Sequence, residues 1–576
     1  MPVSTNGVRN GAATSAARPK VLIAEKVSPD GLALLTGPFD VDEKRGLSPS
    51  DLLAEIPSYD GLIIRSETKV TADVLAVAKN LKVIARAGVG IDNVDVEAAT
   101  KHGVIVVNSP VGNINAAAEH TIALLMATAR NIGDASSSLK AGKWERSRLV
   151  GVEVKGKTLS IIGVGKVGLT VAAAAKGLGM NCLAFDPYAN QKLAAAAGVK
   201  LVGSLAELLK EADFLTIHTP LIASTKGMIG KSELASMKKT ARILNVARGG
   251  MIDETALLEA LEEGTIAGAG IDVFTEEPPT PGSPAAKLIA SSKVVGTPHL
   301  GASTVEAQEN VSIDVCEQVL AILTGQLPRS AVNAPIILPE EYRTLKPFVE
   351  LVEKMGALYM QHFVKASSGA GAVSSAAAFS NDFELQYEGS LATLNTTKPL
   401  FAALVKGLLK PITDSEGHNV NIVNAELVAK DRGIAINEQR RRQTDDPEGY
   451  SSQVSLRTKG GIGSGGQDEH VITGFVSNNM PYISRLSRFS TSFVPQGALL
   501  ICRNFDSPGK IGVVGQKLGK SGVNISSMTV APIDKDDGKS SNEALMILGV
   551  DRVVENEVIQ SLMGEDGVLE TSVVVL

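Results

Sequence analysis

Three side chains, Arg248, Glu277 and His299, combine the chemistry of proton transfer with that of anion binding. An imidazole can take a hydroxyl proton and return it, a carboxylate can favour the charged form of that imidazole, and a guanidinium can bind a carboxylate through its fork of donors. Together these groups suit hydride transfer at a carbon atom that bears a hydroxyl group. Each alone also has an ordinary structural explanation, as a turn residue or a surface charge. The chemistry does not decide between Glu277 and the adjacent Glu276.

Residues 163–168, with the sequence GVGKVG, form a G-x-G-x-x-G motif between a strand-like segment, 159–162, and a helical one, 167–178. In that context the glycines permit a tight turn, close approach of a pyrophosphate and close packing of helix on strand, while the helix N-terminus offers N–H donors to the phosphates. Asp186 ends the next strand-like segment, where an acid accepts hydrogen bonds from ribose hydroxyls and repels a 2′-phosphate. The pattern predicts NAD binding in preference to NADP. The alternative is a glycine turn without a ligand, with Asp186 as a helix cap.

Both sets of residues belong to one series of short apolar segments that alternate with helical patterns. The strand-like segments are 158–162, 181–185, 214–217, 242–246, 269–273 and 293–295. Their continuous hydrophobicity is typical of buried parallel strands, so the series predicts a doubly wound sheet. Ligands of such sheets bind beyond the carboxyl ends of the strands. Arg248, Glu277 and His299 are therefore expected at the crevice where the dinucleotide lies.

A similar series precedes this one, and two different units follow it. Strand-like segments at 21–24, 61–64, 83–85 and 104–107 predict another parallel sheet, and a helix at 304–323 precedes a linker at 327–339. Residues 340–490 begin with a helical pattern and continue with a low-complexity stretch, 366–378, and several strands. The basic run 440–442 beside two aspartates is interpreted as a solvated loop. Residues 498–576 have the order βαββαβ of a ferredoxin-like unit.

Composition excludes several classes of protein. The 576 residues suggest about four domains, and 44% hydrophobic residues exclude a mostly disordered chain. A net charge of −6 argues against a generally basic nucleic-acid binder, and no apolar run is long enough to span a membrane.

Cys182, Cys316 and Cys502 have neither disulfide nor zinc spacing, which favours a reducing compartment and no metal site. Residues 1–18 are interpreted as a disordered tail in a cytoplasmic protein, with a transit peptide for plastid or mitochondrial import as the alternative.

The segments 163–168 with Asp186, 245–250, 272–278 and 298–302 together resemble the D-2-hydroxyacid dehydrogenase family. The resemblance spans residues 20–335 and implies two Rossmann-like domains, with the dinucleotide domain inserted into the substrate domain. It implies that Arg248, Glu277 and His299 are the catalytic residues, with Glu277 and not Glu276 as the partner of the histidine. Positions that match the family's cofactor contacts are Gly163, Gly165, Lys166, Val167, Gly168, Asp186, Thr219, Val246, Ala247, Asp272, Gly301 and Ala302. Val89 and Val246 depart from residues common in relatives, but both positions offer backbone contacts.

Within that family, the first series resembles the branch whose substrate carries a phosphate. By this resemblance Arg65, Ser66, Arg86 and Asn113 face the substrate, and Arg146 reaches the substrate of a neighbouring subunit. It implies NAD-dependent oxidation of 3-phospho-D-glycerate to 3-phosphohydroxypyruvate, the first step of serine synthesis by the phosphorylated pathway, in a homotetramer. Reduction of 2-oxoglutarate is a further expectation. The sole tryptophan, Trp144, lies two residues before Arg146. Its alternative role is that of an ordinary anchor at a dimer interface.

The C-terminal unit resembles ACT domains, which bind amino acids at a subunit interface. Segments 504–512 and 522–525 carry this resemblance. It implies that Asn504, Asp506 and Asn524 hold L-serine as an effector, with the acid on the ligand ammonium and the following helix N-terminus favouring its carboxylate. The alternative is that these polar residues only cap a helix and a turn. The middle segment resembles an allosteric substrate-binding domain by position and length, and no effector residues are assigned in it.

The expected fold class is α/β, with two Rossmann-like parallel-sheet domains, a middle α/β regulatory domain and a C-terminal ferredoxin-like domain. The expected units are a tail at 1–18, a substrate-binding domain at 19–115 and 305–336, an NAD-binding domain at 116–304, a middle domain at 337–495 and an ACT domain at 498–576. The expected partners are a phosphorylated 2-hydroxy acid and L-serine, with no nucleic acid and no membrane. Two alternatives stay open: a glyoxylate or hydroxypyruvate reductase, and an NAD(H)-sensing, corepressor-like binding protein. The ACT-like tail and the N-terminal arginines argue against both.

Overall fold

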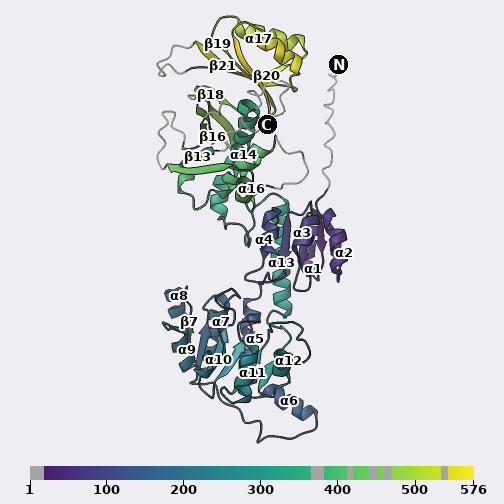
Figure 1. Cartoon of the computed structure of the whole chain (residues 1–576), viewed down its shortest axis with the longest axis vertical. Coiled ribbons are helices and arrows are strands. Elements are labelled where there is room, and N and C mark those ends of the chain that lie inside the picture. Colours follow the sequence, from purple (N-terminus) through teal and green to yellow (C-terminus); the bar gives the residue numbers. More distant parts are fainter. Residues whose placement is uncertain (1–17, 365–381, 412–419, 442–450, 460–468, 534–541) are drawn as a thin grey trace, which may run out of the picture.

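The computed structural model describes residues 18–364, 382–411, 420–441, 451–459, 469–533 and 542–576. The expected tail before Arg18 and the low-complexity stretch 366–378 lie outside these residues. The described residues form four β-sheets with their helices, two wholly parallel, one mixed and one antiparallel (Figure 1). The predicted α/β fold class is confirmed. Figure 1 shows the second parallel sheet at one end of the molecule and the two C-terminal sheets at the other.

The first sheet is wholly parallel and has the strand order β2-β1-β3-β4-β5. Its strands are β1 (Lys20–Ile23), β2 (Asp40–Glu43), β3 (Gly61–Ile64), β4 (Val83–Arg86) and β5 (Ile105–Asn108). Its helices are α1 (Pro29–Thr36), α2 (Pro49–Glu55), the short 3₁₀ turn η1 (Ile56–Ser58), α3 (Ala72–Val77) and α4 (Val96–Lys101). Strand β2 is not among the strands expected from the sequence. Its sequence, DVDE, lacks an apolar run because an edge strand leaves most of its side chains exposed.

The second sheet is also parallel, with the order β12-β11-β10-β9-β6-β7-β8. Its strands are β6 (Thr158–Ile162), β7 (Asn181–Phe185), β8 (Lys200–Leu201), β9 (Phe214–Ile217), β10 (Arg242–Asn245), β11 (Gly268–Ile271) and β12 (Val294–Gly296). Its helices are α7 (Lys166–Gly177), α8 (Gln191–Ala196), α9 (Leu205–Glu211), α10 (Lys231–Ala235), α11 (Glu254–Glu262) and α12 (Pro284–Ala290). The strand order reverses between β6 and β9, the switch point beside which such sheets bind ligands.

Long helices connect the two parallel sheets. Helix α5 (Ile114–Ala129) and the shorter α6 (Ile132–Lys140) lead into the second sheet, and α13 (Val305–Leu323) leads out of it. Apolar residues of α13, among them Val315 and Val319, share a buried cluster with Val21 and Ile63 of the first sheet. Helix α1 approaches α13 so closely that a Cβ on Gly31 would lie 3.0 Å from the carbonyl oxygen of Ser312. The chain therefore returns to the first sheet after completing the second.

The middle unit is a six-stranded mixed sheet with the order β14-β13-β15-β16-β17-β18. Its strands are β13 (Asp382–Gly389), β14 (Ala435–Arg441), β15 (Ser452–Lys459), β16 (Glu469–Ser477), β17 (Met480–Leu486) and β18 (Phe489–Phe493). Its helices are α14 (Pro339–Tyr359), continued as the π-helix η2 (Met360–Val364), then η4 (Ser390–Thr393), α15 (Lys398–Leu409) and α16 (Ala425–Asp431). Helices α14 and α15 touch through glycine, since a Cβ on Gly407 would lie 2.1 Å from the carbonyl oxygen of Glu353.

The interpretation of residues 440–442 as a loop is wrong for the two arginines that the structure describes. Arg440 and Arg441 end strand β14, where they pair in parallel register with Tyr387 and Glu388 of β13. Arg440 Nη1 also donates a 2.8 Å hydrogen bond to the carbonyl oxygen of Leu394. An edge strand needs one neighbour only, and exposed charges on it discourage pairing with another chain. A basic run is thus compatible with a strand at this position.

The C-terminal unit is an antiparallel sheet of order β20-β21-β19-β22 with two helices, which is the predicted βαββαβ arrangement. Its elements are β19 (Ala498–Phe505), α17 (Lys510–Lys520), β20 (Ile525–Pro532), β21 (Glu543–Val550), α18 (Asn556–Met563) and β22 (Val568–Val575). One face of this sheet, including Ile501 and Val574, shares a buried core with helices α14 and α15. Gln361 ties β22 to this core through two 3.0 Å hydrogen bonds with the backbone of Val575.

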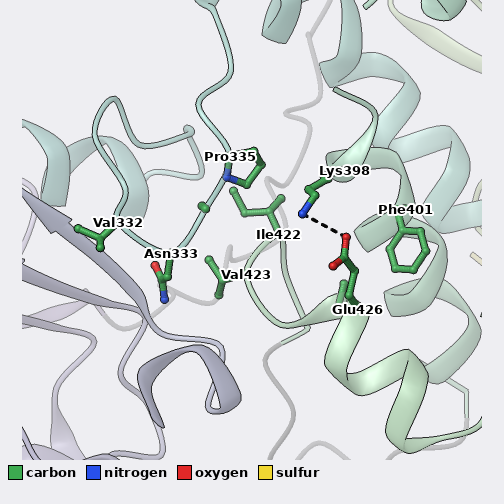
Figure 2. A pocket seen from close by; sticks show the side chains of 10 residues that line it. Val332, Asn333, Pro335, Lys398, Phe401, Ile422, Val423 and Glu426 are labelled. Atoms are coloured by element: carbon green, nitrogen blue, oxygen red, sulfur yellow. Dashed lines mark ion pairs between the residues drawn. The ribbon is translucent and has the colours of Figure 1, made fainter. Parts of the chain in front are cut away.

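The segment between α13 and α14 meets the middle unit at a cavity of about 340 Å³. It is lined by Val332, Asn333, Ala334, Pro335, Lys398, Phe401, Ile422, Val423, Ala425 and Glu426. Lys398 Nζ lies 3.1 Å from Glu426 Oε1, and Figure 2 shows the two side chains facing each other. Asn421 Nδ2 donates to the carbonyl oxygen of Gly103 at 2.7 Å and so links the middle unit to the first sheet.

Within the described ranges, no helix has both the length and the apolar character that a membrane span requires. The same residues contain no group of three or more His, Cys, Asp or Glu side chains that could hold a metal ion.

Candidate active site

The glycine-rich loop between β6 and α7 has the geometry that a dinucleotide-binding turn requires. Gly163 has a φ of 89°, and a Cβ there would lie 2.6 Å from the carbonyl oxygen of His218. A Cβ on Gly168 would lie 2.2 Å from the carbonyl oxygen of Gly163, so helix and strand pack closely there. A Cβ on Gly165 would have no neighbour within 4 Å among the described residues, so space is open above the first turn of α7. The loop therefore fits a pyrophosphate at the helix N-terminus.

Asp186 follows β7 and lies beside this loop. Its Oδ2 accepts a 3.0 Å hydrogen bond from the backbone N–H of Val164, and its Oδ1 accepts a 2.8 Å bond from that of Tyr188. A carboxylate oxygen has two lone pairs, so the half-buried group retains capacity for ribose hydroxyls. Its negative charge opposes a 2′-phosphate, which agrees with NAD as the cofactor.

His299 and Glu277, the predicted acid–base pair, are in direct contact. His299 Nδ1 lies 2.7 Å from Glu277 Oε2, and Glu277 Oε1 accepts a 2.9 Å bond from the backbone N–H of Phe274. Burial raises the pKa of Glu277, but the hydrogen bonds from His299 and from that N–H outweigh it and hold this pKa below its ordinary value. The ionised carboxylate thus accepts Nδ1–H. This leaves Nε2 of His299, which has no hydrogen-bond partner among the described residues, to exchange a proton with a ligand.

Arg248 crosses the crevice from the second sheet to the first. Its Nε donates to Asp92 Oδ2 at 3.1 Å, and its Nη1 donates to the carbonyl oxygen of Ala247 at 2.7 Å. The glycines of residues 88–90 make room for guanidinium groups: a Cβ on Gly90 would lie 2.1 Å from Nη2 of Arg248. The remaining N–H groups of Arg248 are available to a carboxylate ligand.

Arg86 lies in the same cluster, and its pKa is far below the ordinary value. Burial, together with the charge of Arg248, lowers the pKa of Arg86 to about 10, although Asp92 and Glu25 act in the opposite direction. Its Nε is buried and has no hydrogen-bond partner in the described part of the chain. A buried donor without a partner costs free energy, so a bound anion would be stabilised there.

The other residues predicted to face the substrate divide into two groups. Arg65 lies close enough to Arg86 for its charge to lower the Arg86 pKa further, and its backbone N–H donates to Glu25 at 2.9 Å. Ser66 is exposed on the same loop, and Asn113 is the N-cap of α5 without a side-chain capping bond. Arg146 lies instead on an exposed loop after α6, which Figure 1 shows at the far end of the second sheet. Within one chain it does not join the cluster.

The remaining predicted cofactor positions lie on segments that follow strands β9 to β12 of the second sheet. Thr219 Oγ1 lies 3.8 Å from Met251 Sδ, and Val246 is buried at the end of β10 with Ala247 beside it. Asp272, Gly301 and Ala302 belong to the segment around His299, and Asp272 is fully buried. The contacts that these residues make with NAD stay predictions.

The predicted effector residues of the C-terminal unit, Asn504, Asp506 and Asn524, differ in burial and in their hydrogen-bond partners. Asn504 is 4% exposed, its Nδ2 donates to the Phe505 carbonyl oxygen at 2.8 Å, and its Oδ1 has no partner among the described residues. Asp506 and Asn524 are exposed, and the backbone N–H of Asn524 donates to Asp551 Oδ1 at 3.0 Å. Their role stays a prediction.

Sequence reasoning missed three residues of the site: Asp92, Glu25 and His120. Asp92 follows a glycine-rich turn after a strand, and that context was a usable signal. Glu25 follows β1 and accepts backbone N–H groups of residues 65, 67 and 68, which only the fold shows. His120 lies within an apolar helix and belongs to no motif.

Comparison with known proteins identifies the family. The family model of the D-isomer specific 2-hydroxyacid dehydrogenase NAD-binding domain matches residues 122–301, and that of the D-3-phosphoglycerate dehydrogenase intervening domain matches 344–481. D-3-phosphoglycerate dehydrogenase 2, chloroplastic, of Arabidopsis thaliana is 42% identical over 96% of this chain and 86% of its own. The D-3-phosphoglycerate dehydrogenase of Methanocaldococcus jannaschii is 41% identical over 96% of this chain and 99% of its own. A crystal structure of a protein from Thermus thermophilus covers 54% of this chain and 99% of its own, at a TM-score of 0.50 and 36% identity.

The match to an NAD-binding domain agrees with the geometry of the glycine-rich loop and Asp186, and the prediction of NAD as cofactor is confirmed. The chain is an oxidoreductase, so the binding-protein alternative is set aside. Because nearly the whole chain aligns with these relatives, through the C-terminal units as well as the two parallel sheets, it belongs to the D-3-phosphoglycerate dehydrogenase family, within the NAD-binding D-isomer specific 2-hydroxyacid dehydrogenases.

Proposed function

We propose that the protein oxidises 3-phospho-D-glycerate to 3-phosphohydroxypyruvate with NAD, as the first step of serine synthesis by the phosphorylated pathway. The observation that carries the proposal is the 2.7 Å contact between His299 Nδ1 and Glu277 Oε2, beside the guanidinium of Arg248. When bound, NAD⁺ supplies the hydride acceptor for the carbon atom that bears the hydroxyl group. All other steps belong to side chains of the chain itself.

His299 acts as the general base in this direction. Its Nε2 takes the proton of the substrate hydroxyl while Glu277 holds Nδ1–H and stabilises the imidazolium that forms. In the reverse direction the same nitrogen returns the proton to the carbonyl oxygen. Arg248 binds the substrate carboxylate and fixes the reacting carbon atom relative to His299. Such acid–base catalysis contributes on the order of 10²–10⁴ to the rate.

The phosphate group is assigned to the cationic side of the crevice. Arg65, Ser66, Arg86 and Asn113 supply donors from the first sheet and from α5. The unpartnered Nε of Arg86 supports this assignment because it needs an acceptor. Arg146 of the partner subunit is proposed to complete the site, since the loop that carries it is exposed and far from the crevice of its own chain.

A homo-oligomer, expected to be a tetramer, is part of the proposal, and the same loop supports it. Apolar side chains on α6 and on the loop after it are exposed: Ile132 by 54%, Leu139 by 59%, Trp144 by 79% and Val150 by 76%. A patch of this kind is typical of a subunit interface. Its neighbour Arg146 would then lie at the boundary between two subunits.

Two further properties belong to the proposal. L-serine is proposed to act as a feedback effector at the C-terminal unit, where the buried Oδ1 of Asn504 lacks a partner among the described residues and Gly509 precedes helix α17. Reduction of 2-oxoglutarate is proposed because that acid also presents a carboxylate next to a carbonyl group and a second anionic group.

The test is NADH consumption by the purified protein with 3-phosphohydroxypyruvate, hydroxypyruvate, glyoxylate and 2-oxoglutarate, each with and without L-serine. The proposal requires kcat/KM to be highest for the phosphorylated substrate. A higher value for hydroxypyruvate or glyoxylate would make the protein a reductase of unphosphorylated acids. Loss of rate on addition of L-serine supports the effector assignment, and an unchanged rate removes it.

A further inference from the structure

We propose that His120, on helix α5, is a positioning residue that holds the catalytic His299 in place through the buried carboxylate of Asp272. The inference rests on the proposed function of His299 as the proton-transfer group. It concerns a residue that belongs to none of the motifs that carry the cofactor or the substrate.

The segment that carries His299 needs support from outside itself. Residues 297–301 form neither helix nor strand, and His299 has a φ of 55°, in the left-handed region that residues other than glycine rarely adopt. The support comes from Asp272, which is fully buried at the end of β11. Its carbonyl oxygen accepts a 2.9 Å hydrogen bond from the backbone N–H of His299.

The carboxylate of Asp272 binds the rest of this segment. Oδ1 accepts bonds from the backbone N–H of Leu300 at 2.7 Å and from Thr297 Oγ1 at 2.6 Å, and Oδ2 accepts a bond from the N–H of Gly301 at 2.9 Å. The residues before and after His299 are thus anchored to the same buried group. Any displacement of the Asp272 carboxylate would move the imidazole relative to Glu277.

His120 is the one donor to this carboxylate, among the described residues, that comes from a different element. Its Nε2 lies 3.2 Å from Asp272 Oδ1 and 3.0 Å from Thr297 Oγ1. Because the hydroxyl hydrogen of Thr297 goes to Asp272, the hydroxyl oxygen must accept, so Nε2 of His120 carries a hydrogen that both oxygens share. A buried carboxylate that loses a donor becomes less stable in its position.

The electrostatics agree with this geometry. Burial raises the pKa of Asp272, but the hydrogen bonds from His120, Thr297 and the N–H of Leu300 outweigh it and hold this pKa below its ordinary value. Helix α5 packs against β10 and β11, and its N-cap is Asn113, which is assigned to the substrate. One rigid helix therefore connects the substrate side of the crevice to the support of His299.

The experiment compares two substitutions of His120 with a matched control. His120→Leu keeps the bulk but removes the donor, whereas His120→Gln keeps an N–H close to the position of Nε2. We expect His120→Leu to lower kcat about 10- to 100-fold, because small displacements of a catalytic group have effects of this size. The Kd for NADH should change by a much smaller factor than kcat. His120→Gln should recover most of the rate, and His102→Leu, at an exposed histidine after α4, should leave it unchanged.

A double-mutant cycle with His299→Ala separates positioning from general stability. If His120 acts through His299, His120→Leu should cost less than about twofold once His299 is already replaced by alanine. An equal loss in both backgrounds, or no rescue by His120→Gln, would overturn the proposal. Should His120→Leu fail to fold, Thr297→Val removes the shared hydroxyl instead. Its loss of kcat should likewise fall below about twofold once His299 is replaced by alanine. Failure of the proposed function is distinguishable, because the wild type would then lack activity with 3-phosphohydroxypyruvate.

Discussion

Arg248 and Asp92 join the two sides of the candidate active site, with Arg248 Nε 3.1 Å from Asp92 Oδ2. Arg248 follows a strand of the second sheet, and Asp92 follows a strand of the first. The Asp92 side chain is 67% exposed, so this ion pair lies in a highly hydrated environment and contributes about 0–1 kcal/mol. A substrate carboxylate that binds the same guanidinium can therefore displace it or share it.

Asp92→Asn should strengthen the binding of anionic substrates. The amide keeps a hydrogen-bond acceptor for Arg248 but removes the negative charge that competes with the ligand. We expect KM for the 2-oxo acid to fall about two- to fivefold with kcat changed less than about twofold, since one screened charge is worth up to about 1 kcal/mol. Kinetics at low and high ionic strength should show a steeper salt dependence than the wild type. A rise in KM would mean that Asp92 orients Arg248.

Glu277→Gln should lower kcat, whereas Glu276→Gln should not. The neutral amide that replaces the carboxylate at position 277 cannot stabilise an imidazolium at His299, and we expect a loss of about 10- to 100-fold. Glu276 is exposed and makes no contact with His299 among the described residues, so its variant is the matched control. Steady-state rates of NADH oxidation check both. Equal losses in the two variants would contradict the assignment of Glu277.

Arg65→Ala should discriminate between phosphorylated and unphosphorylated substrates. Loss of one charge-assisted contact to a phosphate costs about 1.5–3 kcal/mol, which corresponds to an increase in KM of roughly 10- to 150-fold. Hydroxypyruvate lacks the phosphate, so its KM serves as the internal control and should change little. Equal increases for 3-phosphohydroxypyruvate and hydroxypyruvate would remove the phosphate assignment.

The contact between the middle and C-terminal units should weaken in acid because of His362. This buried imidazole bonds through Nδ1 to Ser572 Oγ of β22 at 2.7 Å. Burial, with smaller contributions from His470 and Arg503, lowers the pKa of His362 to about 4. The unfolded state binds the proton more tightly, so stability is complete above about pH 6.5 and is lost as pH falls towards about 4. At about pH 5 the loss is about 2 kcal/mol.

Hydrogen exchange measured by mass spectrometry checks this prediction locally. Protection of β22, corrected for the intrinsic exchange rate, should fall about 30-fold between about pH 7 and pH 5 in the wild type. The same change should be much smaller in His362→Gln and unaltered in His102→Gln, where the histidine is exposed. Equal pH dependence in the wild type and His362→Gln would contradict the role of His362.

The parts of the molecule that could be predicted from the sequence are those where a single physical requirement selects the residue type. The central strands of both parallel sheets are continuously apolar because both faces are buried. The glycine motif needs Gly163 and Gly168 because a Cβ at either position would clash with a backbone carbonyl oxygen. Edge strands β2 and β14 were not expected, because charged side chains are tolerated where one side faces solvent.

The candidate catalytic residues could be selected from the sequence because each follows a strand of the second sheet, and the structure brings two of them, His299 and Glu277, into contact. The choice of Glu277 over Glu276 required the family resemblance, since both are acids of equal chemistry. His120 was missed because its function depends on which element packs against β11, and no local pattern contains that information. Arg146 has its proposed partners in another subunit, so a single chain does not bring it to the crevice.

The most direct test of the catalytic account is a single turnover of enzyme-bound NADH with 3-phosphohydroxypyruvate, in the wild type and in His299→Ala. If His299 transfers the proton, the variant should oxidise NADH at least about 100-fold more slowly, with the Kd for NADH changed less than about twofold. A single-turnover rate close to that of the wild type, or an equal loss of NADH affinity, would contradict the assignment of His299 as the acid–base group.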